Sequence, residues 1–396
     1  MSQRGSILIL SHACNRAVNR APYAELERLG WRVRVVTAEA LFDGGRWVSA
    51  DPAEVEGPAT AMLPLRGRHA RLQRYGRLSA VLQQERPDWV VADIDPHSWL
   101  AIELAWMKSR FHYRLGFISC ENLPFGPLQL ARRRGWRGLL LGAGCSLARL
   151  IVRPRTDIVF CINSAGKRLF TEAGFKRVVT TPLGFPQRHF KVNPEARSRI
   201  RAQLNLSLPT IAYFGRLTPE KGVHLLLDAL DRLTDPTWHL LIDDFQPNSD
   251  YQAQIRRRMD SAAWAGRARL VEARHGEVAD YMNAADLVVV PSLSTPNWIE
   301  QYGRVVPEAL ACGCRVIASN SGALPELLGS HGRLVEEADP NGLAHAIAAE
   351  IGALASAAGR RTDAADYAAE RLSARAQAQL WDRILTPESA SGALPS

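Results

Sequence analysis

The sequence predicts an α/β protein with two doubly wound parallel sheets, each in its own Rossmann-like domain. Short apolar segments alternate with longer segments of helical periodicity, which is the order of strands and crossover helices in such sheets. The apolar segments lack polar alternation, as expected where helices cover both faces of a sheet. This order restarts after residue 205, and 396 residues exceed the usual length of one compact domain. We therefore expect two similar domains facing a cleft.

The amino-terminal half is expected to begin with a buried strand. Its first apolar segment, "SILIL", is too short for the apolar region of a signal peptide, and polar residues follow it directly. Alternating helices and strands continue from there. The expected strands are 6–10, 32–37, 88–93, 114–119 and 156–163, and helices are expected at 22–30 and 77–87.

The carboxy-terminal half repeats this order. Strands are expected at 208–215, 238–243, 268–273, 286–292 and 314–319, with helices at 221–233, 251–264, 278–285, 306–313 and 324–329. Prolines and a glycine interrupt residues 180–196, which we interpret as the passage between domains, and alanine-rich residues 341–378 are expected to be helical. We expect an amino-terminal domain over 1–186, a carboxy-terminal domain over 187–370, a final helix at 371–386 that returns to the amino-terminal domain, and a disordered tail at 387–396.

Composition favours a cytoplasmic protein with anionic partners. Six cysteines without paired spacing fit a reducing cytosol, and the formal net charge is +9. The basic residues do not form a familiar nucleic-acid module, so no nucleic acid is expected. Arginines beside Trp136 and a leucine-rich run, within 131–155, predict a helix on an anionic membrane surface. The alternative is a solvated basic helix packed on its apolar side.

Several enzyme classes are excluded by missing motifs. The turn after the first strand, "SHACNRAVNR", has no glycine, which argues against a dinucleotide-binding turn. The sequence has no P-loop and no nucleophile elbow of G-x-S-x-G type. Cys312 and Cys314 flank one glycine, but no further ligands lie at zinc spacing. We interpret these two cysteines as small packed residues at a turn, and we expect no metal site.

The segment "YFGRLTPEKG", residues 213–222, has features of a phosphate-binding loop. It follows an apolar strand, places Gly215 at the turn and then presents Arg216 and Lys221. A lysine near a helix start lies where backbone N–H groups already favour an anion. The two cations could neutralise a diphosphate. Alternatively, they are two solvated charges on a strand-to-helix loop.

The segment "EQYGRVVPEALACGC", residues 300–314, places two glutamates eight positions apart. Glu308 lies one turn inside a helix that is expected to start near Gly303 or Arg304. Its carboxylate could accept hydrogen bonds from two ribose hydroxyls, and Glu300 could hold hydroxyls of a hexose, because carboxylates suit vicinal diols. Alternatively, Glu308 only complements the helix dipole.

These segments resemble glycosyltransferase family 4. "GRLTPEKG" resembles that family's G-R-L-x-x-E-K-G loop, and "EQYGRVVPEALACGC" resembles its E-x7-E motif. "TTPLGFPQRHF" resembles the interdomain stretch of the family, and "YMNAADLVVVPS" resembles its strand before the nucleotide site. The resemblance rests on motifs over about residues 155–330 and on layout alone in the amino-terminal half.

The resemblance implies a GT-B fold and a retaining, metal-independent transferase that takes a hexose from a nucleoside-diphosphate sugar and needs no cofactor. The carboxy-terminal domain would bind the donor and the amino-terminal domain a sugar or lipid-linked acceptor. Arg216, Lys221 and Glu300 would act in catalysis. The donor-binding residues implied are Gly215, Arg216, Lys221, Asn297, Glu300, Tyr302, Gly303, Arg304 and Glu308.

The amino-terminal loops depart from the family pattern. Many relatives have a glycine pair after the first strand and a histidine after a later one, where this chain has "SHACNRAVNR" and "FISCENLPF". The loop "IDDFQPNSDYQ" also lacks the usual glycines, which leaves uridine and guanosine nucleotides both open. The residues expected on the acceptor side are His12, Asn15, Asn19, His97, Glu121 and Asn122.

Three readings of function remain at this point. The first is a hexosyltransferase for glycolipid or polysaccharide synthesis, peripheral on the inner face of the membrane. The second is another GT-B activity, such as a sugar phosphorylase or a nucleotide-sugar epimerase. The third is a non-catalytic scaffold that binds a sugar nucleotide, which has no need of four intact donor-site residues.

Overall fold

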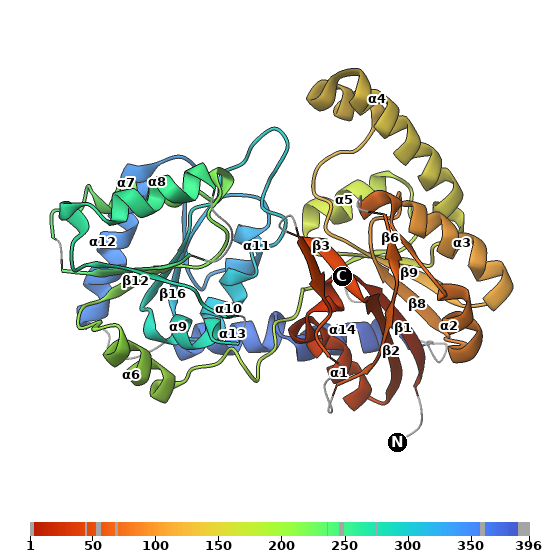
Figure 1. Ribbon diagram of the computed structural model, residues 1–396, viewed down its shortest axis with the longest axis horizontal. Coiled ribbons are helices and arrows are strands. Elements are labelled where there is room, and N and C mark those ends of the chain that lie inside the picture. Colours follow the sequence, from red (N-terminus) through yellow and green to blue (C-terminus); the bar gives the residue numbers. More distant parts are fainter. Residues whose placement is uncertain are drawn as a thin grey trace. The chain divides into compact units, whose positions relative to one another are not determined.

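The chain forms two compact units, which are described separately below. The computed structural model describes residues 4–43, 46–52, 57–67, 70–235, 237–244, 249–274, 276–356 and 361–386 (Figure 1). The first unit comprises residues up to Pro186 together with those from Ser373 onward, and the second comprises Gln187–Leu372. The tail that we expected to be disordered, 387–396, lies outside the described residues.

The first unit is built on a parallel sheet. Within the described residues it has seven strands in the order β11-β10-β9-β8-β1-β2-β5, and every pairing is parallel. Two small antiparallel hairpins, β3–β4 and β6–β7, lie outside this sheet. The strands are β1 (Gly5–Ser11), β2 (Trp31–Ala38), β3 (Ala40–Asp43), β4 (Arg46–Ser49), β5 (Ala59–Leu63), β6 (Leu65–Arg66), β7 (Arg74–Tyr75), β8 (Trp89–Asp93), β9 (Arg114–Ser119), β10 (Ile158–Cys161) and β11 (Val178–Thr180).

The helices of the first unit are capped by polar side chains at several ends. Ser98 accepts a hydrogen bond from the Ala101 amide at the start of α3, and Asn163 accepts one from Gly166 in α5. The last helix of the described chain, α14, also belongs to this unit. The helices are α1 (Ala21–Arg28), α2 (Leu78–Glu85), α3 (Trp99–Phe111), α4 (Pro127–Val152), α5 (Ser164–Glu172) and α14 (Ala374–Leu385).

Helix α14 is held in the first unit by aromatic and ionic contacts. Trp381 stacks on Phe160 with ring centroids 4.4 Å apart, and its indole N–H donates to Thr181 Oγ1 at 3.0 Å. Asp382 accepts hydrogen bonds from Arg4 Nη1 at 2.7 Å and from Trp31 Nε1 at 2.9 Å. The carboxy-terminal helix therefore completes the core of the amino-terminal unit.

The second unit repeats the architecture with a parallel sheet in the order β14-β13-β12-β15-β16-β17. Its core lies between this sheet and its helices and includes the apolar faces of α7 and α12 around β12 and β13. The strands are β12 (Thr210–Tyr213), β13 (His239–Asp243), β14 (Ala268–Val271), β15 (Leu287–Val290), β16 (Arg315–Ser319) and β17 (Arg333–Val335). The helices are α6 (Pro194–Gln203), α7 (Val223–Leu230), α8 (Asp250–Met259), α9 (Val278–Ala284), α10 (Val305–Ala311), α11 (Leu324–Leu328), α12 (Pro340–Ser356) and α13 (Thr362–Arg371).

Helix α4 differs from the single interfacial helix expected over 131–155. Gly135, at φ 60° and ψ −150°, breaks the helix, and Figure 1 shows the first turns folded back at its free end. A Cβ on Gly138 would lie 2.0 Å from the Leu130 carbonyl oxygen, so the folded-back turn needs glycine there. None of the described helices combines the length and the apolar character needed to cross a bilayer.

Candidate functional site

The two candidate sites each lie at a topological switch point. In the second sheet the chain proceeds outward in both directions from the neighbouring strands β12 and β15. In the first sheet the corresponding strands are β1 and β8. Ligands of doubly wound sheets bind beyond the carboxyl ends of the strands at such points. The sequence-predicted donor residues follow β12 and β15, and the expected acceptor residues follow β1, β8 and β9.

In the second unit, the loop after β12 packs tightly on the end of β15. Gly222 has φ +69°, and a Cβ there would lie 1.9 Å from the Pro291 carbonyl oxygen. The Leu293 amide also donates to the Glu220 carbonyl at 2.8 Å. Glycine is needed at 222 both for its backbone angle and for this close approach. The approach places Lys221, at the end of a short 3-10 turn, beside the segment that follows β15.

Lys221 and Glu300 form the centre of the second-unit site. Lys221 Nζ lies 2.6 Å from Glu300 Oε2 and 4.8 Å from the centroid of the Trp298 ring. The Ser292 hydroxyl donates to the same Glu300 oxygen at 2.9 Å. Both charged side chains are largely buried, so the pair is screened much less than a surface ion pair. The cation proposed for the diphosphate and the carboxylate proposed for the hexose are thus brought into direct contact.

The backbone around Glu300 is fixed by a second glycine contact. A Cβ on Gly322, which has φ +54°, would lie 2.0 Å from the Glu300 carbonyl oxygen. That oxygen accepts a hydrogen bond from the Ala323 amide at 3.1 Å. Ser294, in the loop before Glu300, is anchored by Glu337, whose carboxylate accepts from its amide and its hydroxyl at 2.6 Å each. Glu300 is therefore positioned by backbone packing as well as by Lys221.

Glu308 lies inside α10 and is buried. Arg304 Nη2 is 3.4 Å from Glu308 Oε1, one helical turn away. Burial raises the pKa of the Glu308 carboxyl above its usual value, and the neighbouring Arg304 partly opposes this. Gly303, expected near the helix start, has φ +81°, and its carbonyl accepts the Val306 amide at 2.9 Å. That amide is therefore already hydrogen-bonded within the protein.

Other predicted donor residues surround this centre less closely. Arg216 is exposed, and within the described ranges its guanidinium makes no ion pair or side-chain hydrogen bond. Gly215 has φ +135°, which a glycine adopts readily. Asn297 lies on the exposed turn before Trp298, and Tyr302 is buried. The structure thus groups Lys221 with Glu300 and Arg304 with Glu308, and leaves Asn297 at the surface.

In the first unit, a cavity of about 190 Å³ lies at the switch point between β1 and β8. His12 lines it, and its Nδ1 lies 2.6 Å from the Tyr75 hydroxyl. Burial lowers the pKa of His12 to about 4, so this imidazole is neutral at physiological pH. The cavity is lined by His12, Arg71, Asp93, Ile94, Asp95, Ser98, Ile118 and Cys120.

His97 and Glu121, both expected on the acceptor side, lie close together beside this cavity. A ring nitrogen of His97 and a carboxylate oxygen of Glu121 lie within 4.8 Å of one another, and both lie within 4.8 Å of an Asp95 oxygen. Burial lowers the pKa of His97 to about 4. Burial, with the nearby Asp95 charge, raises the pKa of Glu121 to about 7. Asn122, the next residue along the chain, is half-buried.

The two asparagines expected near His12 donate hydrogen bonds to backbone carbonyls of the first unit. Asn15 is buried and donates to the Ala38 carbonyl at 3.4 Å, and Asn19 donates to the Ala13 carbonyl at 2.7 Å. The glycine-free turn is held instead by buried Arg20, which donates to three carbonyl oxygens, those of Cys14, Asp51 and Pro52. These hydrogen bonds give the turn a fixed path without glycine.

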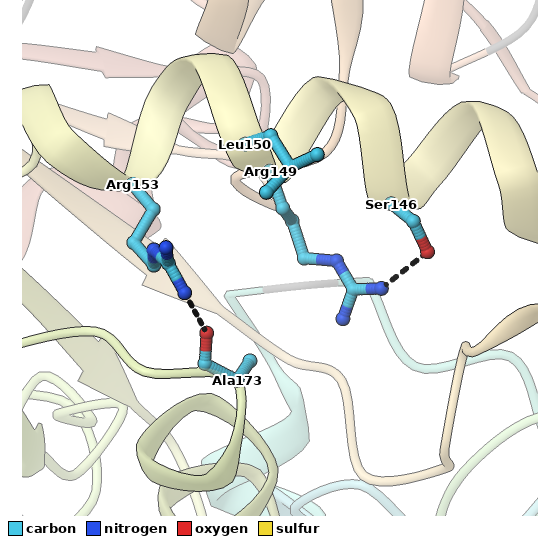
Figure 2. Close-up of a pocket in the computed structure, with 5 residues that line it drawn as sticks. All are labelled: Ser146, Arg149, Leu150, Arg153 and Ala173. Carbon is cyan, nitrogen blue, oxygen red and sulfur yellow. Dashed lines mark hydrogen bonds between the residues drawn. The ribbon is translucent and has the colours of Figure 1, made fainter.

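A further pocket of about 250 Å³ lies between α4 and the end of α5 (Figure 2). Arg149 donates from Nη2 to Ser146 Oγ at 2.9 Å, and Arg153 donates from Nη1 to the Ala173 carbonyl at 3.3 Å. Leu150 and neighbouring Leu147 are exposed on the same helix. Two guanidinium groups beside exposed leucines make this pocket suitable for an anionic, amphipathic group.

The comparison with known families agrees with these two units. Residues 16–184 match the family model described as "Glycosyl transferase 4-like domain", and residues 208–351 match that of "Glycosyl transferases group 1". The chain belongs to the group 1 glycosyltransferase family. The family predicted from the two motifs is therefore confirmed.

Individual relatives of this group 1 family member align over part of their length. The putative teichuronic acid biosynthesis glycosyltransferase TuaC of Bacillus subtilis is 31% identical over 39% of this chain. A lipopolysaccharide 1,2-N-acetylglucosaminetransferase of Salmonella typhimurium is 28% identical over 44% of it. The chain spans 36% and 47% of the lengths of these two curated relatives.

The solved structure of Anabaena HepE in complex with UDP and glucose shares the fold of this family member. The TM-score is 0.70 at 20% identity, over 96% of this chain and 99% of the other. At that identity the likeness shows the fold alone. It confirms the predicted GT-B architecture of two parallel α/β sheets.

Sequence reasoning missed several residues of both sites in this group 1 family member. Ser292 and Trp298, which contact Glu300 and Lys221, stand in the segment between β15 and Glu300, but serine and tryptophan in a loop carry no specific signal. Asp95 was missed beside His97, although "DIDPHSW" places it two residues away.

Proposed function

We propose that this protein transfers a hexose from a nucleoside-diphosphate sugar to a lipid-linked or otherwise membrane-proximal acceptor, with retention of configuration. The observation that carries the proposal is the buried Lys221–Glu300 pair at the switch point of the second sheet. Family membership and the names of relatives that build teichuronic acid and lipopolysaccharide support it. A solved relative of the same fold holds UDP and glucose.

The donor's diphosphate is assigned to Lys221 and Arg216. Lys221 is held in place by Glu300 and the Trp298 ring, so its charge needs no reorganisation when negative charge grows on the leaving diphosphate. Exposed Arg216 lies five residues before it and offers a planar guanidinium that suits a phosphate. Two cations at the leaving group can perform the role that a divalent ion performs in other transferases.

The sugar and the ribose are assigned to the two glutamates. The Glu300 carboxylate contacts Lys221 Nζ directly. A hexose hydrogen-bonded to Glu300 would therefore have its anomeric phosphate near that cation. Glu308 is proposed to accept hydrogen bonds from the ribose hydroxyls, with Arg304 orienting its carboxylate. Retaining transfer of this kind is proposed without a protein nucleophile, so the site needs no second carboxylate placed for double displacement.

The acceptor is assigned to the first unit and to the membrane side of α4. Six large apolar side chains of α4 are between 43% and 70% exposed, and they share the helix with an arginine-rich segment at 132–137. The pocket with Arg149 and Arg153 could hold a phosphate of a lipid-linked acceptor (Figure 2). The apolar side chains are Leu128, Trp136, Leu139, Leu140, Leu147 and Leu150.

The direct test is release of free nucleoside diphosphate. The full chain is incubated with UDP-, GDP- and ADP-hexoses, with and without vesicles that carry a polyprenyl-phosphate sugar, and free nucleoside diphosphate is measured. The proposal expects release from one nucleotide class that vesicles accelerate, and a raised thermal midpoint with the same nucleotide. Sugar 1-phosphate formation from a glucan would indicate a phosphorylase. Binding without release under every condition would indicate a scaffold.

A further inference from the structure

Three chemically active side chains meet at one edge of the first sheet. Strands β8 and β9 are parallel neighbours, with Asp93 paired with Ile118. Asp95 and His97 follow the end of β8, and Glu121 follows the end of β9. One donor atom of each, a carboxylate oxygen or a ring nitrogen, lies within 4.8 Å of the other two. Within the described residues, no other group of three or more such side chains gathers in this way.

Asp95 is already oriented as a ligand would be. Its Oδ1 accepts a hydrogen bond from the Ser119 hydroxyl at 2.5 Å, while its Oδ2 lies 4.0 Å from His97 Nε2. The second distance is too long for a hydrogen bond. A hydrogen bond to one carboxylate oxygen, with the other directed at the centre, is the arrangement that fixes carboxylate ligands in metal sites.

His97 gives the independent indication of a ligand. The residue is 95% buried, and neither Nδ1 nor Nε2 has a hydrogen-bond partner among the described residues. Its ring packs against Phe125 with centroids 4.8 Å apart, which holds the imidazole in place. A buried polar nitrogen without a partner costs free energy that a bound cation at Nε2 would recover.

Glu121 completes the group and forms one long ion pair with Arg71. Its Oε1 accepts a long hydrogen bond from the Leu123 amide at 3.4 Å, and its Oε2 lies 3.9 Å from Arg71 Nη2. Arg71 thus offsets part of the negative charge from a distance. Glu121, Asp95 and His97 each still offer one ligand atom within 4.8 Å of the other two.

We propose that Asp95, His97 and Glu121 bind a divalent transition-metal ion of the Mn²⁺ or Zn²⁺ class. One imidazole nitrogen and two carboxylate oxygens favour such ions over Mg²⁺ and Ca²⁺, which prefer oxygen ligands alone. Metal–ligand bonds of about 2.1 Å place ligand atoms roughly 3 to 4 Å apart, so the widest separation in the observed group, 4.8 Å at most, needs to contract by roughly 1 to 2 Å. Three protein ligands leave coordination positions for water or a hydroxyl group, and Asp95 also lines the adjoining cavity.

This ion is separate from the proposed diphosphate contacts. The diphosphate is assigned to Lys221 and Arg216 in the second unit, whereas the proposed metal site lies wholly within the first. Metal binding can therefore hold while the transferase proposal fails, and the reverse is also possible.

Metal binding is tested on the full chain without an affinity tag. The protein is stripped with a chelator, dialysed, and titrated with Mn²⁺ and with Zn²⁺ in a calorimeter, and bound metal is counted by mass spectrometry. We expect one ion per chain and a higher thermal midpoint on binding. Glu121→Gln and His97→Gln should each lower the affinity at least tenfold, and Ser119→Ala by about tenfold, because it only orients Asp95.

The matched control is His239→Gln, which removes a buried histidine of β13 that belongs to no such group among the described residues. It should bind the ion like the wild type. Circular dichroism identifies any variant that fails to fold. If His97→Gln or Ser119→Ala does not fold, the comparison uses Glu121→Gln instead, because this substitution keeps the size of the side chain. A wild type that binds neither ion at 1 mM, or folded variants that all bind like the wild type, would overturn the proposal.

Discussion

The two glutamates of the second-unit site differ in their partners, which makes their roles separable. Glu300 pairs with Lys221, and Glu308 pairs with Arg304. If Glu308 holds the ribose, Glu308→Gln should weaken binding of the bare nucleoside diphosphate by about tenfold, since it loses charge-assisted hydrogen bonds. Glu300→Gln should change that affinity little but slow transfer, because the product has lost its hexose. Calorimetric titration beside turnover rates measures both.

The opposite pattern would contradict this division. Equal loss of nucleoside diphosphate affinity in both variants would assign Glu300 to the nucleotide as well. A small loss of stability with unchanged ligand binding would mean that both glutamates have only structural roles.

Lys221 should matter for both stability and transfer. Lys221→Ala leaves the Glu300 carboxylate buried without its cation, so we expect the free energy of unfolding to fall by about 3 kcal/mol. Transfer should slow by a factor of about 100 or more, because a charge that stabilises the leaving group is lost. Denaturant unfolding and initial rates of diphosphate release measure the two effects.

Exposed Arg216 is the matched control for that stability effect. Arg216→Ala should slow transfer by a similar factor but leave the free energy of unfolding nearly unchanged, since its side chain is exposed. Normal turnover in both variants would remove these two residues from the site.

At the scale of a single residue, the sequence indicates a chemistry but not the contacts that position it. The order Gly-Arg-Leu followed by Glu-Lys-Gly indicated an anion site, because the residue types themselves carry that chemistry. The Lys221–Glu300 pair could not be predicted, since it joins residues 79 positions apart and depends on the pairing of β12 with β15. Asn15 and Asn19, expected on the acceptor side, each donate a hydrogen bond to a backbone carbonyl, and that expectation stays a prediction.

Among the elements, helix α4 is predicted to bind anionic membranes. Replacing Arg132, Arg133, Arg134 and Arg137 with serine should release the protein from vesicles rich in anionic lipid, because each arginine contributes about 1 kcal/mol near such a surface. Binding of the wild type should also weaken as salt is raised. Co-sedimentation with vesicles at low and high salt measures this.

Leu147→Ser separates the apolar contribution of α4 from its charge. It should weaken vesicle binding at every salt concentration, whereas Leu334→Ser, at an exposed leucine of the second unit, should not. Unchanged sedimentation of the four-arginine variant at low salt would discard the membrane assignment.

The close backbone packing of the loop after β12 is predicted to be sensitive to a substitution at Gly222. Gly222→Ala forces a left-handed angle on alanine and places its Cβ 1.9 Å from the Pro291 carbonyl oxygen. We expect a loss of at least about 2 kcal/mol in the free energy of unfolding, and weaker nucleotide binding. Gly266→Ala is the control, because Gly266 has a similar φ of +75° but nothing within 4 Å of the added Cβ. Equal losses in both variants would mean that the contact with Pro291 is unimportant.

The elements themselves were largely predictable, with consistent exceptions. All the apolar strands expected in both halves are present, because a long buried segment between turn residues has few alternatives. The strands that were not expected are short or half-exposed, such as the hairpin β3–β4 and the edge strands β5, β11 and β17. Edge strands carry weaker apolar patterns because one side lacks a neighbour. The break of α4 at Gly135 was missed because glycine within a helical pattern does not by itself reveal a left-handed angle.

At the scale of the whole molecule, α14 links the stability of the first unit to the end of the chain. Trp381→Ala removes a fully buried ring that stacks on Phe160, at a cost of about 3 to 5 kcal/mol. The calorimetric transition of the first unit should fall by roughly 10 °C while that of the second stays in place. Trp264→Ala, in the core of the second unit, should do the reverse. Loss of both transitions together in either variant would show that the two units unfold as one.

The division of the chain also bears on how the protein is made. The chain leaves the first unit after Pro186 and returns to it at Ser373, so the whole second unit is synthesised before α14 exists. During that interval α1, which packs against α14, and Trp31, which bonds to Asp382, lack their final partners. Domains generally fold as units while they emerge from the ribosome. The second unit can therefore fold first, whereas the first unit keeps an apolar surface exposed until α14 has been synthesised.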